Sequence, residues 1–264
     1  MWNEIPAAHS AAQADLFPDP AAQGVLAAAA AGNSRARLWR AGPAALLWDQ
    51  ANNVLYLAGG PTREAVADLF GVIRAAALDL GRPRVGLRVL GDADPAPLLS
   101  GFPGPAPALT MRHFYAQPRP AAAALPMVEG ATRYELITAA WLAGPPLINL
   151  ERVRAEVEWM WPSLERFAAH GFGVAAVRAG TVACWCTAEY VGAAHCGLGI
   201  ETAEAYQRQG LATAAAARCV AHSLRLGREP HWECDSQNHA SIRVAEKAGF
   251  TRVQTAPFWI GRFA

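Results

Sequence analysis

The segment "YQRQGLATAAAARCV", which runs from Tyr206 to Val220, has the residue types of an anion-binding site. Its polar start passes through a single glycine, Gly210, into a run of small residues that predicts a slim helix. The N-terminus of a helix carries unpaired N–H groups and about half a positive charge, so backbone amides there can hold a phosphate. The pattern is compatible with a diphosphate site in which Gly210 removes a Cβ that would block the ligand. A helix packed tightly on a sheet fits the same short pattern.

A second helix with well-defined ends is predicted downstream, in "NHASIRVAEKAGF". Asn238 is a good N-cap, Ser241 stands at the third helical position, and Gly249 is the residue type that ends a helix. The strand candidate "PHWECDS" lies between the two helices. Strand, phosphate-binding helix, strand and capped helix thus follow one another, which is typical of a mixed α/β layer structure.

The rest of the second half supplies elements that would position these helices. Short apolar runs predict strands, and helical spacing predicts a helical region that Pro162 interrupts. The predicted strands are 133–139, 172–191 with a turn at Ala179-Gly180, 195–202 and 251–260, and the predicted helical region is 149–171.

The first half has an α/β pattern of its own without a phosphate-binding motif. Strands are predicted at 36–42, 43–50, 52–60, 84–91 and 108–117, with helices at 21–31 and, capped by Thr62, at 63–80. A stretch rich in proline and alanine, 118–130, predicts a semi-stiff linker. We therefore expect an N-terminal α/β domain at 1–117, a linker at 118–130, and a second domain at 131–264.

Composition limits the classes of function. The 264 residues are 53% hydrophobic and 17% charged, with a net charge of +1, so no overall field would attract nucleic acid or a membrane surface. The start of the chain lacks the pattern of a signal peptide, and the alanine run at 27–31 is far too short to span a membrane. An odd number of cysteines, 5, indicates reduced thiols and a cytoplasmic protein.

These motifs resemble those of a known family. Gln207-Arg208-Gln209-Gly210-Leu211-Ala212 is similar to the acetyl-coenzyme A motif of the GCN5-related N-acetyltransferases, Gln/Arg-x-x-Gly-x-Gly/Ala, and Asn238-x-x-Ser241 through Gly249-Phe250 is similar to their second motif. The resemblance covers roughly 130–250 and looks closest to a bacterial subgroup with an extra N-terminal region. It implies the α+β mixed sheet of that family for the second half. The first half is compatible with a degenerate copy of the same fold.

The resemblance implies direct transfer of an acetyl group from acetyl-CoA to a primary amine of a small molecule or peptide. It implies no metal, and a monomer or homodimer. The residues expected to bind the cofactor come from the strand end, the loop and the two helices: Ile200, Glu201, Thr202, Gln207, Arg208, Gln209, Gly210, Leu211, Ala212, Thr213, Asn238, Ser241 and Lys247.

Two residues are candidates for the base that removes the proton of the amine. Many relatives have a glutamate where this chain has Cys196, so Glu201, acting through water, and His195 are the alternatives. Relatives often carry a tyrosine at the position of Ala245 as the acid. Here Asn238, Ser241, Tyr206 or water would take that role.

Two further patterns have a structural and a functional interpretation. Cys184, Cys186, His195 and Cys196 could form a zinc cluster, but buried thiols are the favoured interpretation because the spacing lacks a zinc knuckle. Glu156, Glu158 and Glu165 could attract a cationic substrate, although a solvated helix face is the commoner explanation. The missing glutamate and tyrosine also leave open a non-catalytic acyl-CoA-binding module that acts as a sensor or binds a partner.

Overall fold

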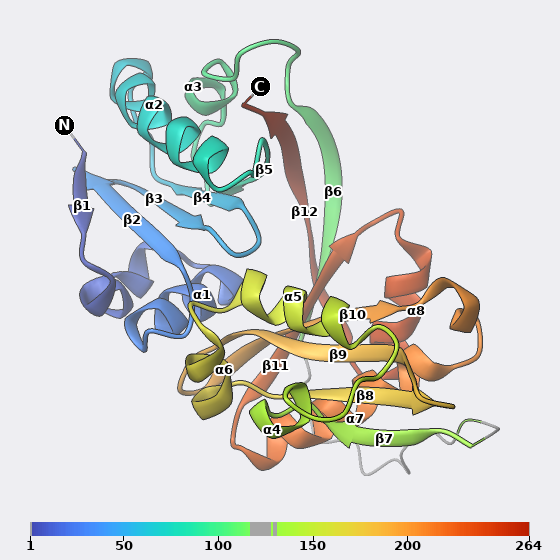
Figure 1. Ribbon diagram of the computed structural model, residues 1–264. Coiled ribbons are helices and arrows are strands. Elements are labelled where there is room, and N and C mark those ends of the chain that lie inside the picture. Colours follow the sequence, from blue (N-terminus) through green and yellow to red (C-terminus); the bar gives the residue numbers. More distant parts are fainter. Residues whose placement is uncertain (1, 117–127, 129–130, 264) are drawn as a thin grey trace. The chain divides into compact units, whose positions relative to one another are not determined.

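The computed structural model describes residues 2–116, 128 and 131–263 (Figure 1). The chain forms two compact units, one made of Met1–Arg112 with Ala256–Ala264 and the other of His113–Thr255. Both units are mixed α/β structures, as the sequence predicts. No helix among the described residues is both long and apolar enough to cross a membrane.

The second unit is built on a mixed sheet. Its strands, from one edge inward, are β7 (Arg133–Leu136), β8 (Gly173–Arg178), β9 (Thr181–Val191), β10 (His195–Thr202) and β11 (Glu229–Asp235), with β6 (Ala108–Ala116) beside β11. Neighbours from β7 to β10 are antiparallel, whereas β10 and β11 are parallel. A parallel pair needs a crossover, and the helix between these two strands provides it.

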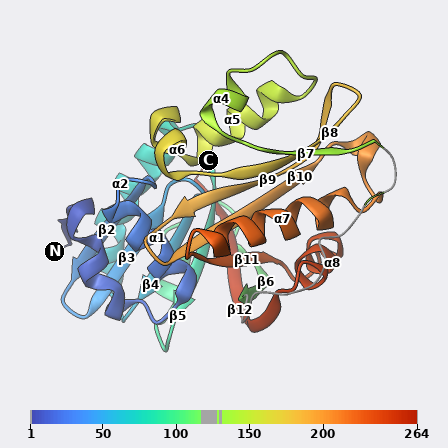
Figure 2. The same ribbon diagram turned by 90° about the horizontal axis from the view of Figure 1, so that it is seen from below.

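Helices cover both faces of this sheet. They are α4 (Ala139–Leu142), α5 (Leu150–Met160), α6 (Leu164–His170), α7 (Leu211–Arg225) and α8 (His239–Lys247), with a 3-10 turn, η2, at Glu204–Tyr206. Figure 2 shows α5 and α6 on one side of the sheet and α7 and α8 on the other. The small residues of α7 explain its place, since Ala214, Ala215 and Ala216 are fully buried in the core.

The first unit repeats this order of elements. It contains β1 (Asn3–Ile5), a 3-10 helix η1 (Ala7–Leu16), α1 (Pro20–Ala30), β2 (Ala36–Ala41), β3 (Ala44–Asp49), β4 (Val54–Ala58), α2 (Arg63–Asp79), β5 (Arg84–Leu90) and α3 (Ala96–Leu99). Strands β1 to β4 are antiparallel neighbours, and β4 and β5 are parallel. Figure 1 shows α1 and α2 on opposite sides of this sheet. The chain therefore contains two versions of one fold.

The C-terminal strand departs from the predicted domain at 131–264. Strand β12 (Thr251–Arg262) pairs antiparallel with β5, from Trp259–Leu87 to Arg262–Arg84, so its end belongs to the first unit. Phe263 explains this placement, because its fully buried ring lies 5.2 Å from the ring of Phe70 and 5.4 Å from that of Phe102. The predicted linker at 118–130 lies, apart from Val128, outside the described residues.

Local sequence signals predict several element ends correctly. Thr62 caps α2 by accepting a hydrogen bond from the backbone N–H of Ala65, and Asn238 caps α8 in the same way with Ser241. Gly249 follows α8 with a φ of +94°, and the break between α5 and α6 falls at Pro162. The elements that the sequence did not predict, β1, η1, α3, α4 and η2, are short or irregular and carry no clear periodicity.

Candidate active site

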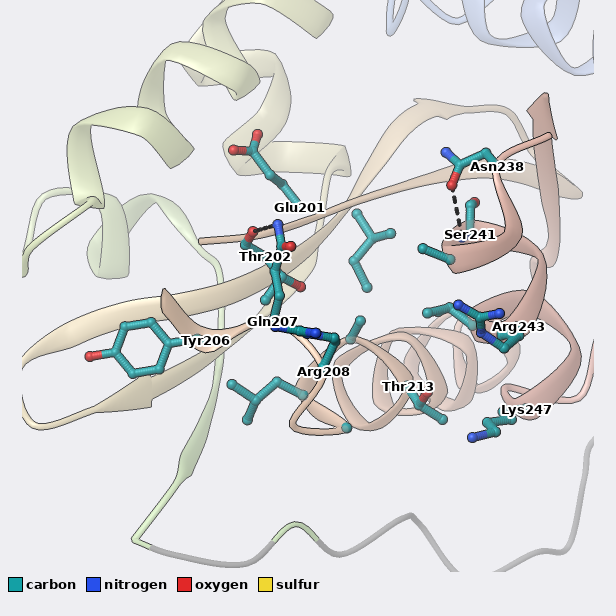
Figure 3. Close-up of a pocket in the computed structure, with 16 residues that line it drawn as sticks. Glu201, Thr202, Tyr206, Gln207, Arg208, Thr213, Asn238, Ser241, Arg243 and Lys247 are labelled. Carbon is teal, nitrogen blue, oxygen red and sulfur yellow. Dashed lines mark hydrogen bonds between the residues drawn. The ribbon is translucent and has the colours of Figure 1, made fainter. Parts of the chain in front are cut away.

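A cavity of about 610 Å³ opens where β10 ends and α7 and α8 begin (Figure 3). Every residue predicted to bind the cofactor lines it, except Gln209. Tyr206, Ala240, Arg243 and Val244 line it as well. The structure therefore brings the two sequence motifs together around one hollow, although they are separated by a whole strand.

The cavity exists because two neighbouring strands part. His195, Cys196 and Gly197 of β10 pair with β11, at Glu229, Pro230 and His231, and the pairing stops there. The rest of β10 keeps its partner on the other side, β9, through to Thr202. The edge of β10 that faces away from β9 beyond Gly197 thus has backbone groups that an extended ligand with amide groups can pair with, like an added strand.

The loop before α7 adopts a left-handed backbone at two points. Gly210 has a φ of +78° and Arg208 a φ of +61°. Loops of this kind turn successive N–H groups toward a common point, where an anion can bind. A Cβ placed on Gly210 would approach only Val128 Cγ2, at 3.8 Å, among the described residues, so no protein atom nearby requires glycine there. The left-handed φ by itself favours glycine at this position.

The cavity favours an anionic ligand. The first turn of α7 contains no acidic residue and no side chain caps it, so its N–H groups are available. Arg208, Arg243 and Lys247 add three cationic side chains to the lining. Arg243 was missed by the sequence analysis, although its spacing of four residues from Lys247 places both on one face of the helix.

Gln207 and Gln209 have structural contacts of different kinds. The side-chain amide of Gln207 donates to the carbonyl of Thr202 at 3.3 Å, which closes the loop onto the end of β10. Gln209 accepts a hydrogen bond from Arg178 at 2.6 Å and donates to the carbonyl of Ala205 at 3.2 Å. It shapes the loop from outside the cavity.

On the α8 side, polar side chains are held in place by local hydrogen bonds. The Asn238 carbonyl oxygen accepts from the N–H of Ser241 at 3.1 Å, and the Ser241 hydroxyl accepts from the indole of Trp232 at 3.0 Å. Both face the cavity as hydrogen-bonding groups. In Figure 3 the Tyr206 hydroxyl points away from the other labelled side chains.

Glu201 is bound by an arginine. Its carboxylate forms an ion pair with Arg152 of α5, and the Arg152 guanidinium also lies over the ring of Trp185, 5.3 Å from its centroid. The Glu201 side chain is 44% exposed, and Figure 3 shows it pointing away from Thr202 and Gln207. As a base, it would have to give up this ion pair in order to take a proton.

The structure does not bring His195 to the cavity. His195 stands at the opposite end of β10, where its Nδ1 lies 3.7 Å from Glu229 and its ring 5.0 Å from the ring of His231. Burial raises the pKa of neighbouring Cys196 to about 12, so this thiol stays neutral and does not replace the carboxylate found in relatives. Ala245, the other departure from the family pattern, is fully buried in the core.

A solvated helix face was expected for Glu156, and the structure contradicts this expectation. Its carboxylate accepts hydrogen bonds of 2.6 Å from the Trp185 indole and from the Thr187 hydroxyl, which ties α5 to β9. Burial raises the pKa of this group, and the two hydrogen bonds oppose the rise. The signal that could have located it is its spacing of four residues from Arg152, which places both on one face of α5.

All cysteines of the chain are free and buried, in line with the favoured interpretation. Burial raises the pKa of Cys184 to about 12. No group of three or more histidine, cysteine or acidic side chains suited to a metal ion occurs within the described residues.

Known sequences match the part of the chain that holds the cavity. Residues 147–258 match the family model described as GNAT acetyltransferase. An uncharacterized N-acetyltransferase of Bacillus subtilis (strain 168), YdfB, is 37% identical over 99 residues. That match spans 38% of this chain and 38% of the curated relative.

Solved structures resemble the chain over nearly its full length. A GCN5-related N-acetyltransferase-like protein from Streptococcus suis has a TM-score of 0.69 at 18% identity, covering 98% of this chain and all of that one. A tandem GNAT protein from the clavulanic acid biosynthesis pathway has a TM-score of 0.57 at 15% identity, covering 100% of this chain and 98% of that one. At such identities the likeness concerns the fold, and the tandem protein agrees with two units of like topology.

Proposed function

Because residues 147–258 match the GNAT acetyltransferase family model, we propose that the protein transfers an acetyl group from acetyl-CoA directly to a primary amine. The acceptor is the amine of a small molecule or of a peptide. The observation that carries the proposal is the cavity at the parting of β10 and β11, where a helix N-terminus, an unpaired strand edge and three cationic side chains converge. Those are the features that a diphosphate followed by a chain of amide groups requires.

Each part of the cofactor has a counterpart in the lining. The amides of 208–212 would hold the diphosphate, and the edge of β10 at 200–202 would pair with the amide-bearing chain. Arg243 and Lys247 would take further phosphate charge. This arrangement would carry the thioester toward the point where β10 leaves β11.

The reaction needs charge stabilisation and the removal of two protons from an amine that arrives charged, one before attack and one as the amide forms. The amine nitrogen attacks the thioester carbon, a C–N bond forms, and the C–S bond breaks to release the thiolate. A backbone N–H near Ile200 would stabilise the charge that develops on the carbonyl oxygen. A free alkyl amine has a pKa of about 10.4, so it must lose a proton, whereas a thiol with a pKa of about 8.5 is a fairly good leaving group.

Calorimetry with acetyl-CoA and an assay of thiol release test the proposal. The amine panel would contain polyamines, aminoglycosides, amino acids and peptides. We expect binding of acetyl-CoA and amine-dependent release of thiol with at least one of these classes. Binding without release across the panel would favour the non-catalytic acyl-CoA-binding module.

A further inference from the structure

A bulge in the central sheet changes the direction of one carboxylate. In the pairing of β9 with β10, Gly197 lies opposite Tyr190 and Leu198 lies opposite Ala188. Glu189 is therefore the extra residue of a β-bulge in β9. Bulges of this kind bend the strand locally and re-aim a side chain.

Gly199 makes room for that carboxylate. A Cβ added to Gly199 would lie 2.1 Å from Glu189 Oε1 and 2.9 Å from its carboxyl carbon, which is closer than atoms can approach. The Glu189 carboxylate therefore rests on the backbone of Gly199. Unlike Gly210, Gly199 has no left-handed φ, so its lack of a side chain is explained by this close approach alone.

The contact lies in the part of β10 that has left β11. Gly199 comes two residues after Gly197, the last residue of β10 paired with β11, and directly before Ile200, which lines the cavity. Side chains alternate along a strand, so the faces of Gly199 and Glu201 differ from that of Ile200. Glu189 thus stands on the α5 face of β10, the same face as Glu201, which also lines the cavity.

Other charged and polar groups surround this face of the sheet. Thr187 lies opposite Gly199 in the register and donates its hydroxyl proton to Glu156 of α5. Glu201, two residues along β10, is bonded to Arg152. Among the three carboxylates near this face, Glu189 is the one that lies against the backbone of β10 where the strands part.

We propose that the Glu189 carboxylate accepts the proton of the attacking amine. This role rests on the proposed acetyl transfer. As the nitrogen forms its bond to the acetyl carbon and the sulfur leaves with the electron pair of the C–S bond, an N–H proton passes to a Glu189 oxygen. The proton then passes to solvent or to the thiolate, which yields the amide and coenzyme A.

The first test is Glu189→Gln, which keeps the shape of the side chain and removes its basicity. Turnover of acetyl-CoA with the best amine of the panel should fall roughly 10²–10⁴-fold, the usual effect of losing a positioned base. The calorimetric Kd of acetyl-CoA should stay within about twofold, since the cavity lining is unchanged. The rate of the variant should rise with pH toward the amine's own pKa of about 10.4. Glu158→Gln, an exposed carboxylate on α5, is the matched control.

A double-mutant cycle tests the contact with Gly199. Gly199→Ala should displace the carboxylate and lower turnover on its own. In Glu189→Ala the space above Gly199 is empty, so adding Gly199→Ala should cause no further loss. If the fold losses of turnover of the two single variants multiply in the double variant, Gly199 serves another purpose and the assignment is overturned.

The outcomes separate this role from the proposed function. Wild-type activity together with near-normal turnover of Glu189→Gln would overturn the role of Glu189 alone. A wild-type protein that releases no thiol with any amine would overturn acetyl transfer and this role together. A smaller rate loss accompanied by weaker acetyl-CoA binding would indicate a structural carboxylate and also overturn it.

Discussion

The two parallel strand pairs, β4 with β5 and β10 with β11, differ in how much of their length is paired. In the first unit every residue of β4 has a partner in β5, from Val54–Gly86 to Ala58–Leu90. In the second unit the equivalent pair, β10 and β11, stops after Gly197–His231, and the cavity begins there. The same fold thus provides a closed sheet in one unit and an open edge in the other, and the open edge arises from missing hydrogen bonds rather than added elements.

The helices that follow β4 and β10 differ in the same sense. Helix α2 begins at Thr62, whose hydroxyl accepts a backbone N–H, and Glu64 adds negative charge to its first turn. Helix α7 begins at Gly210 without a side-chain cap and without an acid. The start of α2 is therefore poorly suited to a phosphate, and we expect the first unit to bind no coenzyme A.

The largest effect is expected from a substitution at Phe263, whose ring packs in the core of the first unit. Phe263→Ala should lower the free energy of unfolding by about 3–5 kcal/mol, because it empties a fully buried aromatic site between Phe70 and Phe102. Chemical denaturation measures the loss, with Phe263→Leu as the milder control. If the units differ in function as proposed, folded Phe263→Ala keeps the wild-type Kd for acetyl-CoA. A loss of less than about 1 kcal/mol would contradict the packing role.

A charge at the start of α7 should abolish the difference between the two helix starts. Gly210→Asp places a carboxylate and a side chain at a left-handed position in the predicted diphosphate site, so the Kd for acetyl-CoA should weaken at least about tenfold, or 1.4 kcal/mol. Thr62→Asp is the matched variant, because aspartate also caps helices, and it should leave the Kd unchanged. Titration of the wild type should give one equivalent of cofactor per chain. Two equivalents, or equal effects of the two substitutions, would remove the contrast between the units.

Glu201→Gln should have a smaller effect, because this carboxylate is half-exposed and bound to Arg152. Loss of an exposed ion pair costs about 0–1 kcal/mol of stability, and we expect turnover to fall less than about tenfold. Thermal unfolding and the thiol assay measure the two quantities. A turnover loss as large as that of Glu189→Gln would instead assign the base to Glu201, acting through water.

The smallest expected effect is a change in the pH dependence of stability at Glu156. An acid whose pKa is raised by folding, here above 4.5, binds more protons in the folded state, so stability falls as pH rises through the raised value. Glu156→Gln keeps an acceptor for the Trp185 indole, lets the amide NH2 donate to the Thr187 hydroxyl in place of the bond that it accepted, and removes this fall. Relative to wild type it should therefore gain stability in denaturation curves as the pH rises above 4.5. A parallel pH dependence in both proteins would contradict the raised pKa.

Local features of the site could be predicted from the sequence. The caps at Thr62 and Asn238 and the turn at Gly210 depend on residues within a few positions, and such signals survive in a single sequence. The sequence also predicted that the two motifs lie around one cavity, because their order along the chain matches a known pattern.

Contacts between distant segments were beyond the sequence signals. The ion pair of Glu201 with Arg152 joins β10 to α5 across 49 positions of the chain, and no local pattern indicates it. The approach of Glu189 to Gly199 depends on a bulge, and β9 is buried almost throughout, so its sequence has no polar–apolar alternation that would reveal an extra residue. The split of β12 between the units was missed for the same reason, since its strand pattern runs on without interruption.

The pairing of β12 with β5 has a consequence for synthesis on the ribosome. Strand β12, which pairs with β5 of the first unit, is translated after most of the second unit. Until Phe263 has been made, part of the apolar surface of Phe70 and Phe102 stays uncovered. Such long-range closure is slow and leaves a nascent chain prone to aggregation. The first unit therefore begins to fold first but acquires β12 only after the second unit has been made, and an intact β12 decides whether the earliest part of the protein matures.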